Sequence, residues 1–257
     1  GFKVEGGDPR LGGPVGPGGR DERILAYTSR IGRLYAEYPL LRKIVREGRV
    51  EVVGTECLRN LSQPAILASC HLANWELVGH VMTLLGAPAC ALHDPPENPV
   101  RRRLAAQARH GWVPDSQLIA ASPQALRQLC KALGAGRNLL LYIDEVKDGV
   151  VWAPSLGRHM PERGNRWLAA RLAVRFGVDL LPVHVERIEP LRFRIVISER
   201  LRAAGGSDEE RTRFLANQLD RWLEAQVRGH PEQWYGLWEF DLGDPLPEQP
   251  AREARSA

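Results

Sequence analysis

A histidine and a glutamate lie five positions apart in the stretch PAILASCHLANWELVGH, residues 64–80, between two apolar segments. His71 ends the first apolar run, and Glu76 precedes the second. A carboxylate beside an imidazole orients the ring and stabilises its protonated form, which a general base needs when it takes a proton from a hydroxyl. The pair therefore predicts acid–base chemistry, although a capped turn with a structural histidine explains the same residues equally well.

This spacing is not specific by itself, because the chain holds three matches of a histidine followed by an acid after four residues. His184 and Glu189 fall in one strand-like run, where residues five apart point to opposite faces. His110 and Asp115 span a glycine and a proline, which is typical of a loop. The match at His71 lies where a strand-like run meets a helical one, and ligands of open α/β sheets bind at such places.

Asn74 stands at the start of a helix that we expect over residues 74–85. An asparagine is a favoured N-terminal cap, and a carboxylate in the first helical turn is favoured as the anion. In one regular helix, the side chains of positions five apart diverge by about 140° and would not meet. Because we expect His71 in the turn before the helix, this restriction does not apply, and Glu76 can approach His71.

Apolar runs and helical periodicity alternate along most of the chain. We expect strands over residues 50–54, 65–70, 89–93, 138–143, 149–154, 179–188 and 191–200. We expect helices over residues 21–48, 74–85, 99–111, 122–136, 163–177 and 208–229, with a break at Pro39. This alternation predicts an α/β domain with a mostly parallel or mixed central sheet flanked by helices. The domain is expected over residues 21–245, between a flexible glycine- and proline-rich tail over 1–20 and a second tail over 246–257.

Composition and charge limit the classes of function. The 257 residues are 44% apolar, enough for a sizeable core, and carry a formal net charge of +4 without a dense run of lysine or arginine. A nucleic-acid partner is therefore not expected, whereas an acidic carrier protein or an anionic membrane face suits a mildly cationic surface. The four cysteines form no CxxC pair, so no metal site is expected.

No run of 18 apolar residues occurs, so no membrane-spanning helix is expected. The chain begins with Gly1 rather than methionine, which is consistent with removal or omission of an upstream segment. Attachment to a membrane would then come from an amphipathic surface or from that segment.

Several stretches resemble, in order and spacing, the bacterial lipid A biosynthesis acyltransferase family of late lauroyl and myristoyl transferases. HLANWEL resembles the histidine–acid signature of that family. Further matching stretches are GRVEVVGTECL, RHG, LYIDE, VWAPSLGR, GNRWLAARLAVRFGVDLLPVHVER and PEQWYGLW. The resemblance covers about residues 48–240 and implies a fold like that of the glycerolipid acyltransferases. The chain departs from the family at Ala73, where glycine is usual.

The resemblance implies roles for the residues around the pair. His71 would be the general base that takes the proton of an acceptor hydroxyl, and Glu76 would orient or stabilise that histidine. Asp144 ends the strand expected over residues 138–143 and would be a second carboxylate at the same sheet edge. A turn residue is the alternative for Asp144, in which case Glu145 takes its role.

The same resemblance implies a substrate-binding set of Arg109, Asn74 and Glu145. Arg109 lies 38 residues after His71 and would hold a phosphate of the donor or acceptor, with a solvated arginine at a helix end as the alternative. No covalent acyl-enzyme is needed, which agrees with the lack of a GxSxG motif. Cys70 adjoins His71, but neighbours at a strand end point apart, so we do not expect a thiol nucleophile.

By this resemblance the chain is an enzyme that moves a fatty acyl chain from an acyl carrier protein or coenzyme A thioester to a hydroxyl of a glycolipid. A lipid A precursor at the cytoplasmic face of the inner membrane is the expected acceptor, and no cofactor is expected. One alternative is the same chemistry on another acceptor, such as a mannosylated phosphoinositide, another lipid or a pathway product. A second is a non-catalytic protein that binds lipid or carrier on the same fold.

Overall fold

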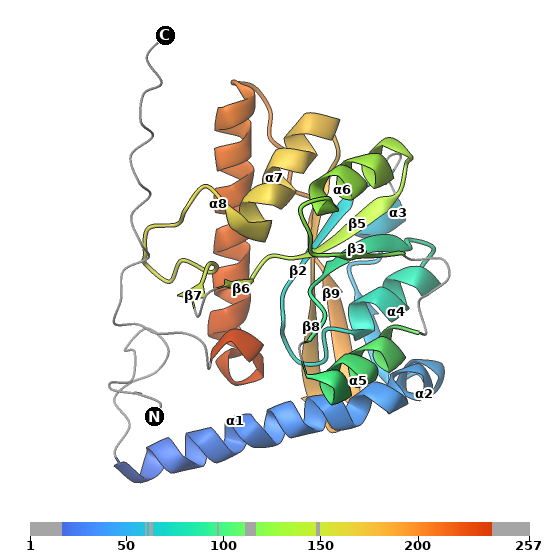
Figure 1. The fold of residues 1–257 in the computed structure, drawn as a ribbon, viewed down its shortest axis with the longest axis vertical. Helices are drawn as coiled ribbons and strands as arrows, with labels where there is room; N and C mark the ends of the chain where they lie inside the picture. The colour runs from blue at the N-terminus through green and yellow to red at the C-terminus, as the bar shows by residue number, and fades with distance from the viewer. Residues whose placement is uncertain are drawn as a thin grey trace.

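The computed structural model describes residues 17–59, 61, 64–96, 98–110, 117–147 and 150–237 of the chain. The predicted C-terminal tail, most of the predicted N-terminal tail and Asp115 lie outside these residues. The described chain forms an α/β structure, with helices on both faces of a central sheet (Figure 1). This is the fold class that the alternation of strands and helices predicted.

Seven strands form the central sheet in the order β1-β9-β8-β2-β5-β3-β4. Their bounds are β1 Val50–Val53, β2 Ile66–Ser69, β3 Ala89–His93, β4 Gln117–Ala120, β5 Asn138–Tyr142, β8 Leu180–Glu189 and β9 Arg192–Ile197. The five neighbouring strands from β8 to β4 are parallel, while β9 runs antiparallel to β8 and parallel to β1. A separate hairpin pairs β6 (Val146–Lys147) with β7 (Val150–Val151).

The strand β5 lies between β2 and β3, although it follows both of them in the chain. Its register sets Tyr142 beside Ser69 of β2 and Leu140 beside Ala91 of β3. Since these strands are parallel, the segments that follow β2, β5, β3 and β4 all leave the sheet at one edge. Ligands of open α/β sheets bind at this edge.

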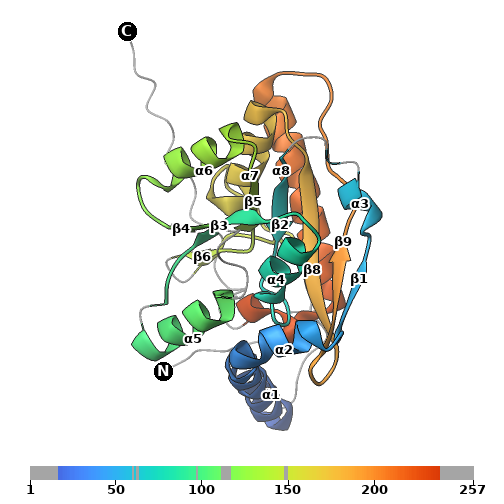
Figure 2. The same ribbon diagram turned by 90° about the vertical axis from the view of Figure 1, so that its right-hand side faces the viewer.

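Helices cover the two faces of the sheet and bury a separate core on each (Figures 1 and 2). One face carries α1 (Pro17–Glu37), η1 (Tyr38–Leu40), α2 (Leu41–Arg46), α4 (Leu77–Leu84) and α5 (Pro99–Arg109). The other carries α6 (Ala125–Gly134), α7 (Gly164–Phe176) and α8 (Asp208–Gly229). In β2, Ile66 and Ala68 join the α6–α8 core and Leu67 joins the other, because successive side chains of a strand alternate between faces.

The helices α4 and α1 start at other residues than the sequence led us to expect. α4 begins at Leu77 rather than at residue 74, because residues 71–76 form a turn in which Ala73 has a left-handed φ of 48°. Glycine adopts this conformation without the steric cost that a Cβ brings. α1 begins at Pro17, so the last residues of the predicted N-terminal tail are helical.

The short elements α3 (Glu56–Arg59), β4 and β6 were not predicted, and neither were the 3-10 helices η2 (Pro231–Gln233) and η3 (Tyr235–Leu237). The strand β4 pairs with β3 alone and lies at one edge of the sheet, opposite β1. An edge strand of four residues does not show the continuous apolar run of a central strand, so pattern reasoning misses it. The α6 helix also starts late, at Ala125 rather than at residue 122.

Candidate active site

His71 follows β2, and Asp144 follows the adjacent strand β5. His71 Nδ1 lies 2.8 Å from Asp144 Oδ1, and the backbone N–H of His71 donates to Asp144 Oδ2 at 2.8 Å. Trp234 Nε1 donates to the same Oδ2 at 3.0 Å. The carboxylate in contact with His71 is therefore Asp144, and not Glu76 as the spacing predicted.

The surroundings of Asp144 determine which nitrogen of His71 carries the proton. Burial alone would raise the pKa of Asp144, but the charge of His71 and the hydrogen bonds from His71 and Trp234 outweigh it and hold that pKa below its ordinary value. An ionised carboxylate only accepts hydrogen bonds, so Nδ1 of His71 must donate. In the neutral ring Nε2 then keeps its lone pair, which is the state that a general base requires.

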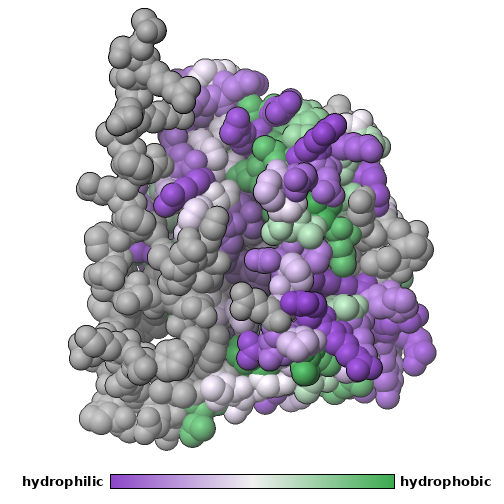
Figure 3. Space-filling model, viewed as in Figure 1, coloured by the Kyte–Doolittle hydropathy of each residue, from purple (hydrophilic) through white to green (hydrophobic). Residues whose placement is uncertain are grey.

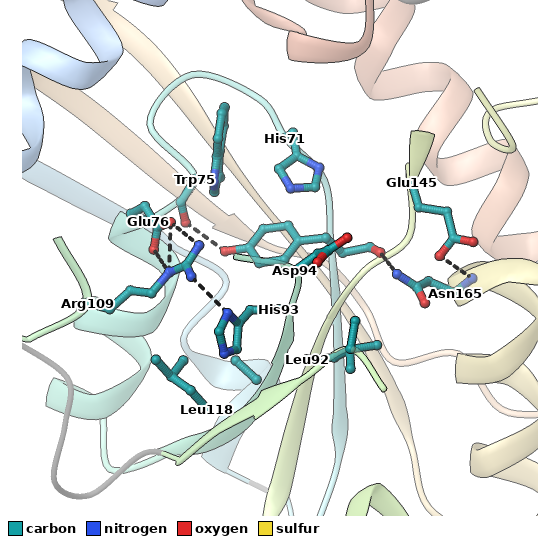
Figure 4. A pocket seen from close by; sticks show the side chains of 13 residues that line it. His71, Trp75, Glu76, Leu92, His93, Asp94, Arg109, Leu118, Glu145 and Asn165 are labelled. Atoms are coloured by element: carbon teal, nitrogen blue, oxygen red, sulfur yellow. Dashed lines mark hydrogen bonds and ion pairs between the residues drawn. The ribbon is translucent and has the colours of Figure 1, made fainter. Parts of the chain in front are cut away.

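Aromatic rings hold the His71 imidazole in place. Tyr142 stacks on it with ring centroids 4.6 Å apart, and Trp75 meets it edge-on at 4.8 Å. The Tyr142 hydroxyl donates to the carbonyl of Trp75 at 3.0 Å, which ties the two rings together. The ring of His71 points into a cavity (Figure 4), where the described residues offer Nε2 no hydrogen-bond partner.

Glu76 and Arg109 form a second, separate pair at the same cavity. Arg109 Nη2 donates to Glu76 Oε1 at 2.7 Å, and Nε lies 3.0 Å from both carboxylate oxygens. Burial disfavours the charge of Arg109, but the Glu76 carboxylate outweighs it and raises the pKa of Arg109. Only 16% of the Arg109 side chain is exposed, so the alternative of a solvated arginine at a helix end is wrong.

The cavity has a volume of about 460 Å³ and opens at the carboxyl edge of β2, β5, β3 and β4. Its walls are formed by His71, Trp75, Glu76, Ala91, Leu92, His93, Asp94, Arg109, Leu118, Ala121, Tyr142, Glu145 and Asn165 (Figure 4). Ligand sites commonly fall between about 300 and 1,000 Å³. Apart from Tyr142, six of the lining residues have ionisable side chains: His71, Glu76, His93, Asp94, Arg109 and Glu145. The cavity can thus hold a small polar group against the lone pair of His71.

Of the predicted substrate-binding residues Asn74 and Glu145, only Glu145 lines the cavity. Asn74 is completely buried and is not among the residues that line the cavity, and its side-chain amide donates to Glu37 at 3.1 Å. It also does not cap α4, whose N-cap position is Glu76. Glu145 does line the cavity, and it accepts a hydrogen bond from the backbone N–H of Asn165 at 3.0 Å, at the start of α7.

His93, Asp94 and Trp234 were not predicted as site residues. His93 ends β3 and Asp94 follows it, so both occupy the same kind of position as His71 and Asp144. That position was a usable signal, since parallel neighbours bring their carboxyl ends together. Trp234 had no local signal, because only the folded chain brings it to Asp144, 90 residues away.

Cys70 is not placed to act as a nucleophile in the site as described. Cys70 is completely buried, and this burial raises the pKa of its thiol well above the ordinary value, which disfavours the nucleophilic thiolate. Nowhere in the described ranges do three His, Cys, Asp or Glu side chains gather in a way that could hold a metal ion.

A histidine–carboxylate dyad beside an open polar cavity fits acyl transfer to a hydroxyl, and comparison with known families points the same way. The bacterial lipid A biosynthesis acyltransferase family matches residues 38–239. The chain belongs to this family. Membership confirms the resemblance that HLANWEL and the later stretches suggested, and it makes the chain an acyltransferase. No curated protein matches the chain. None of the described helices is both long and apolar enough to cross a membrane.

Proposed function

We propose that this acyltransferase moves a fatty acyl chain from an acyl carrier protein or coenzyme A thioester to a hydroxyl of a glycolipid such as a lipid A precursor. The observation that carries the proposal is the 2.8 Å contact of Asp144 with His71 Nδ1, which leaves Nε2 facing the cavity as a base. A hydroxyl bound there would lie within reach of that lone pair.

In the proposed reaction, His71 Nε2 takes the proton of the acceptor hydroxyl while its oxygen attacks the thioester carbonyl carbon. The carbon–sulfur bond breaks as the ester bond forms, and the departing thiolate takes the proton back from the imidazolium. Asp144 stabilises the imidazolium between these two transfers. The acyl group passes directly to the acceptor, so no covalent acyl-enzyme forms.

We also propose that the protein binds the membrane that holds its lipid acceptor. The outer surfaces of α1, α2 and α5 carry a group of exposed cations, which we call the cationic face: Arg33, Arg42, Lys43, Arg46, Arg101, Arg102 and Arg103. Leu25 of α1, Leu40 of η1 and Val100 of α5 are also exposed. Figure 3 presents this mixture of hydrophilic and apolar surface over α5 and α2. Cations interleaved with apolar side chains favour binding at an anionic lipid surface.

The cationic face adjoins the cavity. Arg109, which lines the cavity, is the last residue of α5, and the guanidinium of Arg101 lies 5.6 Å from the ring centroid of Tyr35 on α1. Figures 1 and 2 both place α1, α2 and α5 side by side at one end of the molecule. A bilayer on that face would bring the acceptor to the mouth of the cavity.

The test compares the lipids of cells with and without the protein by mass spectrometry, and initial rates of acyl transfer in vitro. Cells that contain the protein are expected to gain a species heavier by one acyl chain. His71→Ala is expected to lower the rate by about 10²–10⁴-fold, the usual contribution of a positioned base. His110→Ala, an exposed histidine at the end of α5, is the control and should keep the wild-type rate.

Equal rates for wild type and His71→Ala, at matched thermal unfolding, would contradict the mechanism. A mass increase on another lipid would replace the glycolipid acceptor while leaving the chemistry in place. Binding of thioester or lipid without any turnover would favour a non-catalytic role.

A further inference from the structure

The cavity contains a second imidazole, His93, whose surroundings are the reverse of those of His71. His93 Nδ1 lies 3.4 Å from Arg109 Nη1. A guanidinium stays protonated and only donates hydrogen bonds, so Nδ1 of His93 must be the acceptor. The remaining proton of the neutral ring is then on Nε2. Desolvation and the charge of Arg109 lower the pKa of His93 below its ordinary value, which favours this neutral form.

The two histidines, which both line the cavity, therefore carry opposite groups on Nε2. Asp144 accepts from Nδ1 of His71 and leaves a lone pair on Nε2, whereas Arg109 donates to Nδ1 of His93 and leaves an N–H on Nε2. Figure 4 shows the two rings on different sides of the cavity, with His93 beside Arg109 and Leu118. A ligand that reaches His71 with a hydroxyl can meet His93 with another atom, which must be a hydrogen-bond acceptor.

Arg109 is held on three sides. Its Nε and Nη2 donate to Glu76, which is buried, and its Nη1 faces His93, so of its five N–H groups one on Nη1 and one on Nη2 remain. Of the described residues that line the cavity, Arg109 alone is an arginine or lysine, while Asp94 and Glu145 add two carboxylates to the wall. These carboxylates repel an anion in the cavity. The cavity therefore suits an uncharged group better than a phosphate dianion.

We propose that His93 is a specificity-determining residue, whose Nε2–H donates to an uncharged oxygen of the substrate group in the cavity, and that the Glu76–Arg109 pair positions His93 for this contact. The oxygen is a hydroxyl, ether or carbonyl oxygen, of a sugar or of the amide-rich arm of the thioester donor. This deepens the proposed function and rests on it for the identity of the substrate. It also assigns Glu76 and Arg109 a role other than holding His71 or a phosphate.

The state of the ring can be measured without any substrate. In the full chain labelled with ¹⁵N-histidine, long-range ¹H–¹⁵N correlations distinguish the two neutral tautomers, and His71→Gln and His93→Gln variants assign the signals. At neutral pH, His93 is expected to carry its proton on Nε2 and His71 on Nδ1. Inorganic phosphate at millimolar concentration should leave the His93 signals in place. A proton on Nδ1 of His93, a protonated ring or a shift on adding phosphate would overturn the proposal.

The positioning role of the pair has its own test. The double variant Glu76→Gln/Arg109→Met keeps the summed charge of the two positions and removes the donor to Nδ1. We expect His93 in that variant to exchange between both tautomers and its pKa to rise towards the ordinary value of about 6.5. An unchanged Nε2–H tautomer would remove Arg109 from the role. Arg109→Gln, which retains a donor, is the second variant in case the first does not fold.

Two amide substitutions at His93 separate the donor from the rest of the ring. The glutamine amide extends to the place of Nε2, whereas the asparagine amide ends near the place of Nδ1. With the thioester and acceptor that support turnover, His93→Asn is expected to raise KM by about 5–100-fold, the range for an unsatisfied polar partner, with little change in kcat. His93→Gln should stay within a few-fold of wild type.

Equal KM values for His93→Asn and wild type would contradict the contact, and a fall in kcat without a change in KM would assign His93 to the chemical step instead. If wild type turns over no thioester, the proposed function fails, while the tautomer measurement still decides the state of His93.

Discussion

At the scale of single residues, Asp144 accepts three hydrogen bonds, from Nδ1 and the backbone N–H of His71 and from Nε1 of Trp234. An asparagine has one carbonyl oxygen and one NH₂ group, so it cannot accept all three. In Asp144→Asn, the side-chain NH₂ group can donate to Nδ1 of His71, and the ring then carries its proton on Nε2 instead. Otherwise the NH₂ group faces one of the three N–H donors, and that hydrogen bond is lost.

We therefore expect Asp144→Asn to slow acyl transfer by about 10²–10⁴-fold, since a wrong histidine tautomer alone costs about 10⁴ in the serine proteases. Initial rates at matched folding measure this. Asp94→Asn makes the same change at an exposed carboxylate outside the dyad, and it tests whether the loss of one negative charge at the cavity is enough to slow acyl transfer. Rates that fall equally in both variants would argue against a special role for the dyad.

The same carboxylate affects stability in acid. Because the pKa of Asp144 in the folded chain lies below its ordinary value, its contribution to folding is present above the unfolded value of about 3.9 and is lost as pH falls through the folded value. Wild type should therefore lose more free energy of unfolding than Asp144→Asn between neutral and strongly acidic pH. Parallel curves from denaturant unfolding across that range would show that the pKa of Asp144 is not lowered in the fold.

The sequence located His71 but not the carboxylate in contact with it. His71 and Glu76 are neighbours in the chain, and pattern reasoning favours such pairs. The turn over residues 71–76 instead points Glu76 at Arg109, 33 residues away. Asp144 was placed correctly at the sheet edge because it ends a strand. Its contact with His71 depends on β5 inserting beside β2, and strand order is a property of the whole sheet that no local pattern carries.

At the scale of elements, the segment after α8 holds the turn that carries His71. Tyr235 N donates to the carbonyl of His71 at 2.9 Å, and Ala73 N donates to the carbonyl of Gln233 at 3.0 Å. The side chain of Gln233 in turn accepts from the backbone N–H of Arg187 at 2.7 Å, at the end of β8. The left-handed conformation of Ala73 is thus supported by long-range hydrogen bonds, although its Cβ disfavours it.

The substitution Gly236→Ala tests whether the segment after α8 positions Asp144 through Trp234. A Cβ at this position would lie 2.5 and 2.6 Å from two atoms of the Trp234 indole, so Gly236→Ala must displace the ring that donates to Asp144. We expect a destabilisation of about 1–3 kcal/mol, typical of overpacking, together with loss of activity. Denaturant unfolding and initial rates measure the two effects.

Gly229→Ala is the matched control. Gly229 ends α8, and a Cβ there would meet no atom within 4 Å, so the exchange should be neutral or stabilise by about 0.5–1 kcal/mol. Wild-type activity in Gly236→Ala would mean that Trp234 does not help to position Asp144.

Elements with strong periodicity were predicted well. The helix expected over residues 208–229 is α8, and its start is fixed by a capping box between Ser207 and Glu210. The strand pair expected over residues 179–188 and 191–200 is the hairpin of β8 and β9. Errors fall where tertiary contacts decide the local conformation, as at the start of α4.

At the scale of the whole molecule, cations are distributed over both sides of the sheet, but those of the cationic face lie beside the cavity. The arginines of α7 and α8, such as Arg171, Arg175 and Arg221, belong to the opposite side and are also exposed. This division allows two variants with an equal change in charge, one on each side. They separate an oriented docking surface from a general effect of positive charge.

The triple change of Arg101, Arg102 and Arg103 to glutamine is expected to weaken binding to anionic vesicles by about a hundredfold, at about 1 kcal/mol for each cation near the surface. The same change at Arg171, Arg175 and Arg221 should leave binding near the wild-type level, because charges more than about 10 Å from the bilayer are screened at ordinary ionic strength. Co-sedimentation with vesicles that contain phosphatidylglycerol measures both, and wild-type binding should fall in high salt. Equal weakening in the two variants would contradict an oriented face. A wild-type chain that stays in the supernatant at low salt would remove membrane docking by this surface and favour an acceptor that reaches the cavity from solution.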